Sequence, residues 1–410
     1  MFNIPIYQKE LASMEKLPEG VIKKILNFIT LNDQLKYGLT NKYYYNLILT
    51  QLIDLDLSGK LIGKNIQIAK KLEKMPNLTT LNLSYNDIGD DEIQKLAQSL
   101  EKMTQLTSLN LRSNNITDKI IQIIAQSLKM LTQLTSLDLS YNDIGVDEIQ
   151  ALAPSLANMT QLTSLNLSFN HIGDDGIQVL APSLKKMQKL IILDLTRNNI
   201  TGETMQIVAK RLEKMPNLTT LNLFFGDDGI REFAQSLEML PSLTSLNLSN
   251  NNITGDTMQI VAKRLEKMPN LTTLNLSNND IRDRIRELAQ SLKMLTQLTS
   301  LNLSTNKIGV GIRLLAPCLA NMQQLTSLNL TYNRIGDIGI RALAPCLANM
   351  QQLTSLYLCL NDIGDIGIRA LAPSLANMQQ LRILDLSNNY ISDIGKQALK
   401  SINAKFDLKL

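Results

Sequence analysis

The chain has 410 residues, of which 44% are hydrophobic and 4% aromatic, and it carries 41 basic against 37 acidic side chains. The mild net charge of +4 is spread along the sequence and gives no electrostatic argument for nucleic acid as a partner. The single histidine excludes a pair of histidine metal ligands. The sequence also has no apolar run of about 18 residues, so no membrane-spanning helix and no membrane partner are expected.

The first fifty residues predict three short helices and show no repeat. Leu17 and Pro18 are followed by aliphatic residues at helical spacing, then by an Asp-x-Leu turn at Asp33 and a basic-aromatic run that ends at Tyr45. Over residues 17–47 this pattern resembles an F-box. The resemblance implies docking on the Skp-type linker subunit of a cullin-RING ubiquitin ligase, through a surface or supporting core formed by Leu17, Pro18, Ile22, Ile25, Leu26, Leu35, Leu39 and Tyr43.

Two features of this segment depart from the F-box pattern. The family usually has Val-Cys and then Trp where this chain has Leu39-Thr40 and Tyr43, and Gly20 weakens the first helix by up to about 1 kcal/mol relative to Ala. The alternative interpretation is a plain helical cap that closes the open end of a stack of repeats. Residues 1–50 are therefore an F-box-like helical segment for which both roles stay open.

From residue 51 to 410 the pattern Leu-x-x-Leu-x-Leu-x-x-Asn-x-Ile returns at about 28-residue spacing. Each unit adds a segment whose apolar residues recur at helical spacing, as in residues 91–100. Neither a short strand nor such a helix buries its apolar face alone, so neighbouring units must stack around a shared core. This domain is predicted to be an α/β leucine-rich repeat horseshoe of about 13 repeats, with parallel strands inside and helices outside. Its units begin at Leu52, Leu78, Leu106, Leu134, Leu162, Leu190, Leu218, Leu243, Leu271, Leu298, Leu325, Leu353 and Leu381. The units resemble the ribonuclease-inhibitor class of leucine-rich repeats.

Several details of the repeats predict local structure. The ninth residue of nearly every unit is Asn, which we expect to form a ladder of hydrogen bonds along the stack. The unit that begins at Leu218 lacks three residues, including this Asn, and predicts a local tightening or kink. Prolines inside the helical stripes predict short or bent helices. The alternating tail from Phe406 to Leu410 predicts a final edge strand.

The variable positions of the strand segments predict a binding face. Side chains between the motif leucines should face the concave side of the stack, and most of them are Ser, Thr, Asn or Asp. Aromatic residues and Arg are the types that most often contribute binding energy. The predicted target-binding residues on this face are Tyr85, Arg112, Tyr141, Phe169, Arg197, Phe224, Phe225, Tyr332, Tyr357 and Leu360. The alternative is that these aromatic rings pack on neighbouring strands and only stabilise the sheet.

Catalysis is not expected from this sequence. The only histidine, His171, falls on a predicted loop, and there is no glycine-rich phosphate loop and no Cys-x-x-Cys pair. No metal, cofactor or catalytic residue is therefore predicted. His171 is interpreted as a solvated substitution within its repeat.

Cysteine and asparagine usage points to the cytoplasm. Cys318 and Cys346 fall at equivalent helix positions one repeat apart, too far for a disulfide, and Cys359 falls on a strand, so three reduced thiols are expected. Asn-x-Ser/Thr triplets recur on the predicted strands, where glycans would block stacking.

Together with the F-box resemblance, these features predict a substrate-recognition adaptor of a ubiquitin ligase. The alternative is a free-standing scaffold or inhibitor that binds one protein. The composition and near-identical repeats also resemble F-box proteins of intracellular bacteria, which implies an effector in a host cytosol.

Overall fold

The computed structural model describes residues 53–59, 72–88, 90–212, 215–224, 226–240, 242–400, 402 and 406–410. The chain divides into two compact units, one comprising residues 1–142 and 154–162 and the other residues 143–153 and 163–410. The residues predicted to contact a ligase linker lie outside the described residues, as does one predicted target-binding residue: Leu17, Pro18, Ile22, Ile25, Leu26, Leu35, Leu39, Tyr43 and Phe225.

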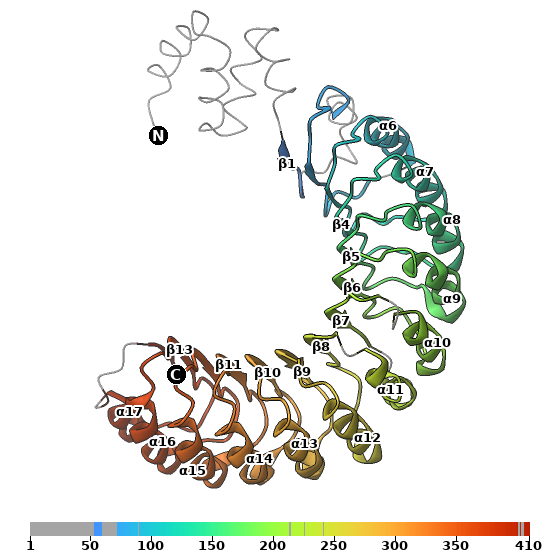
Figure 1. The fold of residues 1–410 in the computed structure, drawn as a ribbon. Coiled ribbons are helices and arrows are strands. Elements are labelled where there is room, and N and C mark those ends of the chain that lie inside the picture. Colours follow the sequence, from blue (N-terminus) through green and yellow to red (C-terminus); the bar gives the residue numbers. More distant parts are fainter. Residues whose placement is uncertain are drawn as a thin grey trace, which may run out of the picture. The chain divides into compact units, whose positions relative to one another are not determined.

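Short parallel strands form one side of each unit (Figure 1). Each strand has three residues, and from β1 to β13 its central leucine is buried while its two neighbours are not fully buried. Neighbouring strands pair leucine to leucine, as Leu81 with Leu109. The first unit contains β1 (Asp54–Asp56), β2 (Thr80–Asn82), β3 (Ser108–Asn110) and β4 (Ser136–Asp138). The second unit contains β5 (Ser164–Asn166), β6 (Ile192–Asp194), β7 (Thr220–Asn222), β8 (Ser245–Asn247), β9 (Thr273–Asn275), β10 (Ser300–Asn302), β11 (Ser327–Asn329), β12 (Ser355–Tyr357), β13 (Ile383–Asp385) and β14 (Asp407–Lys409).

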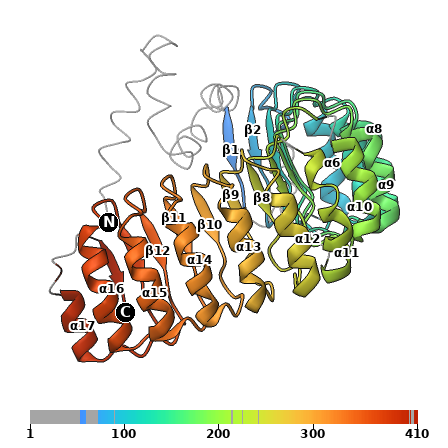
Figure 2. The same cartoon turned by 60° about the horizontal axis from the view of Figure 1, so that its bottom comes forward.

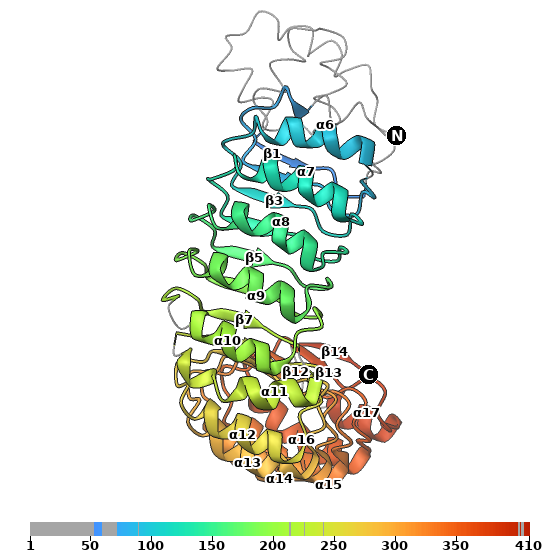
Figure 3. The same cartoon turned by 90° about the vertical axis from the view of Figure 1, so that its right-hand side faces the viewer.

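A helix follows nearly every strand and buries one apolar face against it. In the second unit the helices lie on the outer side of a curved stack and the strands on its inner side (Figures 1 and 3). The α-helices are α6 (Asp90–Leu100), α7 (Asp118–Leu128), α8 (Val146–Leu156), α9 (Gly173–Leu184), α10 (Gly202–Leu212), α11 (Gly226–Ala234), α12 (Gly255–Leu265), α13 (Ile285–Leu292), α14 (Ile312–Leu319), α15 (Gly336–Leu347), α16 (Asp365–Asn377) and α17 (Asp393–Lys400). Single 3-10 turns also occur: η3 (Leu237–Met239), η4 (Arg282–Arg284) and η5 (Gly309–Gly311). The predicted strand–helix repeat is confirmed.

The prolines do not consistently shorten their helices: α14, which contains Pro317, has eight residues, but α8, which contains Pro154, has 11. Helices α9, α15 and α16 contain Pro182, Pro345 and Pro373 and have 12, 12 and 13 residues, whereas α6 and α10, without proline, have 11. Pro182 and Pro345 are each the third residue from the helix end. A proline there removes only one of the last hydrogen bonds, and the freed carbonyl can be hydrated.

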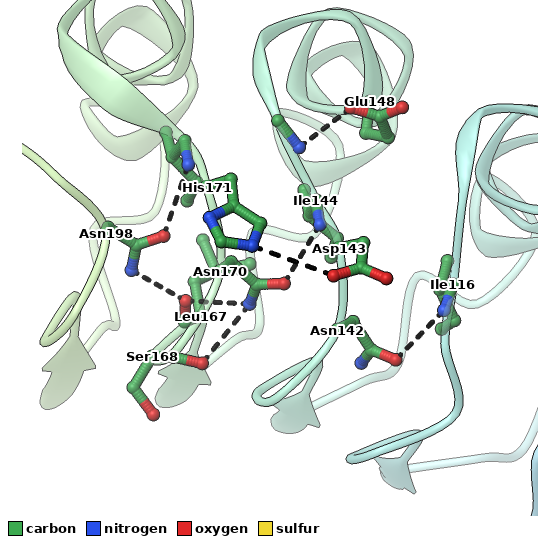
Figure 4. Close-up of polar contacts among 12 residues, drawn as sticks. Ile116, Asn142, Asp143, Ile144, Glu148, Leu167, Ser168, Asn170, His171 and Asn198 are labelled. Carbon is green, nitrogen blue, oxygen red and sulfur yellow. Dashed lines mark hydrogen bonds and ion pairs between the residues drawn. The ribbon is translucent and has the colours of Figure 1, made fainter.

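The predicted asparagine ladder is confirmed. Asn198 donates from Nδ2 to the Leu167 carbonyl at 2.8 Å (Figure 4). It also donates to the Leu195 carbonyl at 3.1 Å and accepts from the backbone N–H of Ile172. Asn86 and Asn114 make equivalent bonds in the first unit. A buried asparagine thus satisfies backbone groups that the three-residue strands leave unpaired.

The shortened repeat keeps its place in the sheet. Strand β7 pairs with β8 in register, with Leu221 opposite Leu246, and Asn251 still donates to the Leu223 carbonyl at 3.1 Å. The deletion is taken up after the strand, where α11 has only nine residues. Here α11 approaches α10 so closely that a Cβ on Gly202 would overlap the backbone of Gly229.

Candidate protein-interaction surface

Most of the predicted target-binding residues lie beyond the strands and not on them. Of the predicted residues that the structure describes, only Tyr357 belongs to a strand, β12. Strand β2 ends at Asn82, whose Oδ1 accepts a hydrogen bond from the backbone N–H of Ser84 at 3.1 Å. This side-chain turn ends the strand one residue past its central leucine, Leu81. Tyr85 therefore follows the turn, and strict alternation along a strand does not decide where it points.

The residue directly before each ladder asparagine has a left-handed backbone. The φ angles are 58° at Tyr85, 54° at Tyr141, 53° at Phe169, 56° at Tyr332 and 56° at Leu360. Asn is among the few non-glycine residues that tolerate this conformation, and it occupies the same position as Asn250, Asn278 and Asn388. Bulky residues at this position are held against their local preference.

The next repeat holds this strained backbone in place. The N–H of Tyr85 donates to the Arg112 carbonyl at 2.9 Å, and the N–H of Tyr332 donates to the Cys359 carbonyl at 2.9 Å. Their side chains project from the stack, with 54% of Tyr85 and 52% of Tyr332 exposed. We use the name strand-exit surface for the predicted target-binding residues that the structure describes, nearly all of which follow a strand. They are Tyr85, Arg112, Tyr141, Phe169, Arg197, Phe224, Tyr332, Tyr357 and Leu360.

In the first unit the strand-exit surface carries a patch of two tyrosines around one arginine. Arg112 donates from Nε to the hydroxyl of Tyr85 at 2.9 Å. Its guanidinium lies 4.1 Å from the ring centroid of Tyr141 and 5.7 Å from that of Tyr85. Stacking on the rings holds the arginine flat and keeps its other donors available to a partner.

The second unit repeats this arrangement with phenylalanines. The guanidinium of Arg197 lies 4.5 Å from the ring centroid of Phe224 and 5.9 Å from that of Phe169. Arg197 itself occupies the left-handed position, with φ 58°. The sequence predicted these residues as candidates but not their grouping into aromatic–arginine–aromatic patches.

A third group lies in the C-terminal repeats of the second unit. Tyr332 and Leu360 occupy the left-handed position of successive repeats, and Tyr357 is a half-buried strand residue. Tyr390, which follows the ladder residue Asn389, was not predicted and is 75% exposed. Its signal in the sequence is a large aromatic residue where the other units have mainly Asp, Asn or a basic residue.

The structure places His171 at the surface, as expected for a loop residue. Its Nε2 lies 3.7 Å from Asp143 Oδ1, and both side chains are largely exposed (Figure 4). Within the described residues no group of three His, Cys, Asp or Glu side chains could hold a metal ion. In the same part of the chain, no helix has both the length and the apolar character needed to cross a lipid bilayer.

The cysteines are free thiols, as predicted. Cys318 is buried, and Cys346 and Cys359 are half-buried. Burial raises the pKa of the Cys318 thiol and of the Cys346 thiol, because a thiolate is poorly solvated there. Each of these two sulfurs lies 3.8 Å from a carbonyl oxygen one helical turn earlier.

Family models for leucine-rich repeats match the chain over most of its length. One matches residues 74–97, 102–125, 131–153, 158–181, 186–206, 240–258, 267–287, 321–344 and 349–372, and a second matches residues 380–402. The chain is a leucine-rich repeat protein. It therefore belongs to a class of scaffolds that bind proteins. One of the unmatched stretches, residues 207–239, contains the shortened repeat.

A comparison with solved structures finds similarity to bacterial leucine-rich repeat proteins. An internalin from Listeria monocytogenes is 26% identical, with 88% of this chain and 96% of that chain covered and a TM-score of 0.49. A leucine-rich repeat protein of Leptospira interrogans is 20% identical, with 92% and 98% covered and a TM-score of 0.49. No curated protein matches this chain in sequence. The family models match repeats only, so the resemblance of residues 17–47 to an F-box stays a prediction.

Proposed function

We propose that this leucine-rich repeat scaffold binds a target protein through the strand-exit surface. The observation that supports the proposal is the presence of Tyr85, Tyr141, Phe169, Tyr332 and Leu360 at left-handed, exposed positions. A bulky residue there strains the backbone by about 1 kcal/mol and buries little area in return. Residues that oppose both local preference and solvation are expected at functional positions.

Other repeats of the same chain supply a matched test. Asn occurs naturally at the left-handed position as Asn250, Asn278 and Asn388, so Tyr332→Asn and Leu360→Asn should fold normally. We expect proximity labelling in the native cell to identify a target protein whose labelling falls at least about tenfold in the double variant. Thr305→Asn, at the same position of another repeat, is the control and should leave labelling unchanged. Equal labelling of the target by the unaltered chain, the double variant and the control variant would contradict the proposal.

We further propose that the scaffold acts as the substrate-recognition adaptor of a ubiquitin ligase. The support is the resemblance of residues 17–47 to an F-box and the order of segments, with repeats that bind a target following a segment that binds the linker. The chain performs no chemistry in this role, because holding the target near the ligase supplies effective concentration. Its partners are then a Skp-type linker and the target protein.

A pull-down with purified Skp linker tests the adaptor role independently. We expect the full chain to retain the linker, and Leu17→Ala with Pro18→Ala to abolish retention while the repeats stay folded. No retention by the intact, folded chain would eliminate the adaptor. The free-standing scaffold, with the N-terminal helices only a cap, would then remain, and target labelling would be unaffected.

The proposed compartment is the cytoplasm, or a host cytosol after secretion by an intracellular bacterium. The three free thiols support it. The asparagines of the Asn-x-Ser/Thr triplets support it too, because a glycan on these side chains would disturb the strand ends that they cap. The side-chain oxygens of these residues accept the capping hydrogen bonds: Asn82, Asn166, Asn247, Asn275, Asn302 and Asn329. Fractionation of the native cell tests the proposal, and a glycosylated chain in a secretory compartment would refute it.

A further inference from the structure

Four aliphatic side chains form an exposed row along the helices of the last repeats. Val310, Ile338, Ile366 and Ile394 occupy the same position of successive repeats and are 58%, 61%, 61% and 55% exposed. Val310 lies in η5, the turn that leads into α14, and the other three lie at the starts of α15, α16 and α17. These four helices lie side by side (Figure 2).

The row is a departure from the rest of the chain. In the eight preceding repeats the corresponding residue is charged: Asp91, Lys119, Asp147, Asp175, Glu203, Asp228, Asp256 and Asp283. Charged residues suit a solvent-exposed helix start, and single exposed aliphatics are ordinary. Four in succession make a row of exposed apolar side chains, and a concentration of such side chains usually marks an interaction site.

The glycine that follows each aliphatic residue fixes the geometry of the row. A Cβ on Gly339 would lie 2.8 Å from Ile312 Cγ2, and a Cβ on Gly367 would lie 2.6 Å from Asp337 Oδ1. A Cβ on Gly395 would overlap Asp365 Oδ1. Each helix start is therefore pressed directly against the preceding repeat. The exposed aliphatics are held at the helix spacing, about 8–10 Å apart.

Arginines flank the row on the same helix faces. Arg313, Arg341 and Arg369 each lie three residues after an aliphatic member and are exposed. Within the described part of the chain, none of them forms an ion pair. We call these three arginines and the four aliphatics the convex ridge.

The neighbouring carboxylates are occupied by the next repeat. Asp337 Oδ1 accepts from the backbone N–H groups of Gly364 and Gly367 at 2.7 and 2.9 Å. Asp365 Oδ1 accepts from the N–H groups of Ser392 and Gly395 at 2.9 and 3.1 Å. The acceptor atoms of Asp337 and Asp365 are therefore engaged within the stack, whereas the arginines have no ion-pair partner within the described residues, so the polar groups free to contact a partner include the guanidinium donors.

We propose that the convex ridge binds an acidic amphipathic helix of a second protein, lying across α14 to α17. Two turns of an α-helix span about 10.5 Å, which matches the spacing of packed helices in the ridge. Apolar residues of the partner at seven-residue spacing can fill the gaps between the aliphatics, while its carboxylates meet the arginines. A second copy of this chain would set arginine against arginine, which is unfavourable.

Two synthetic 22-residue helices are suitable probes, and anisotropy of a fluorescent label measures their binding to the full chain. Both carry leucine at seven-residue spacing, and one has glutamate and the other lysine on the flanking positions. We expect the glutamate helix to bind and the lysine helix to bind at least about tenfold more weakly. No binding of the glutamate helix at concentrations up to about 1 mM would overturn the proposal.

Variants of the ridge separate its two components. Ile338→Asp with Ile366→Asp restores the residue type of the preceding repeats, so the fold should tolerate it, and it should weaken binding at least about tenfold. Arg341→Glu with Arg369→Glu should exchange the preference so that the lysine helix binds more tightly. Asp147→Asn, at the same position in an earlier repeat, is the control. Unchanged affinity in both double variants would overturn the proposal. The proposal would also be overturned if the chain bound phosphatidylserine vesicles in place of the peptide and the ridge variants abolished that binding. The same holds if light scattering showed dimers that the ridge variants abolished.

Discussion

The Nε of Arg112 donates a hydrogen bond to the hydroxyl of Tyr85 across 2.9 Å, linking side chains of two successive repeats. The same guanidinium stacks on Tyr141 in the following repeat, 4.1 Å from its ring centroid. One arginine thus connects three repeats at the surface. This connection limits side-chain freedom before any partner binds, which reduces the entropy lost on binding.

Arg112→Ala should lower the free energy of unfolding by less than about 2 kcal/mol, because exposed cation–π contacts contribute about 0.5–1 kcal/mol each. Arg112→Lys should recover only part of the loss, since an ammonium cannot stack flat on Tyr141. Urea denaturation of the two variants and of Tyr85→Phe, which removes only the hydroxyl, measures the separate contributions. If Arg112→Ala lowered the free energy of unfolding as much as replacing a buried leucine with alanine does, the patch would be structural.

Asn333→Ala should destabilise the chain by about 3 kcal/mol or more. Asn333 Nδ2 donates to the carbonyls of Leu303 and Leu330, and its Oδ1 accepts from the backbone of Asn306 and Ile308. Each buried backbone group left unsatisfied costs about 1–3 kcal/mol. Thermal or urea unfolding measures the change. Asn321→Ala, at an exposed position of the preceding repeat, is the control and should change stability by less than about 0.5 kcal/mol. Comparable losses of stability in both variants would refute a special role for the ladder.

Gly202→Ala should destabilise more than the same substitution at Gly255. The two glycines stand in nearly identical sequence, Ile-Thr-Gly-x-Thr-Met-Gln-Ile-Val-Ala-Lys-Arg-Leu. A Cβ at position 202 overlaps the backbone of Gly229, whereas nothing lies within 4 Å of one at position 255. We expect the free energy of unfolding to fall by about 2–3 kcal/mol in Gly202→Ala. In Gly255→Ala it should fall by about 1 kcal/mol, because φ at this position is +26°. Equal losses in urea unfolding would contradict the close approach of α10 and α11.

Cys318 should react slowly with thiol reagents in the folded chain. Burial raises the pKa of this thiol, so the reactive thiolate is scarcer at pH 8 than in a free cysteine. Stopped-flow labelling of a variant with Cys346→Ser and Cys359→Ser should be at least about tenfold slower than in urea. The rate should keep rising with pH beyond the usual thiol range. Labelling as fast in the folded state as in urea would mean that Cys318 is accessible.

The repeat itself was predictable because its signal is strong and periodic. Buried leucines at Leu81 and Leu83 alternate with polar residues, and Asn86 returns in register in the following units, so strands and ladder follow from the pattern. The final edge strand was predicted from Phe406, Leu408 and Leu410 for the same reason and is β14. The candidate arginines and aromatics were predicted because they interrupt a monotonous set of small residues.

Other features were mispredicted or missed because neighbouring repeats decide them. Tyr85 was expected to face out of a strand, but the side chain of Asn82 ends that strand first. The row from Val310 to Ile394 was not predicted, although the corresponding residues of the preceding repeats are charged, because an aliphatic residue in a helical segment is more often part of the core. The deletion after Leu223 was expected to tighten or kink the stack, and the structure places the loss in α11 with the strand register intact.

The sequence by itself determined a stack of strand–helix units with leucines inside, because each unit can bury its apolar face only against another copy. It also determined the ladder, since a buried amide at a fixed position has only backbone groups to satisfy. Tertiary structure alone decided which of two nearly identical glycines is crowded, which arginine stacks on which ring, and which aspartates are occupied by the next repeat. Those outcomes depend on atoms about 28 residues away in the chain, and a local pattern carries no distances between repeats.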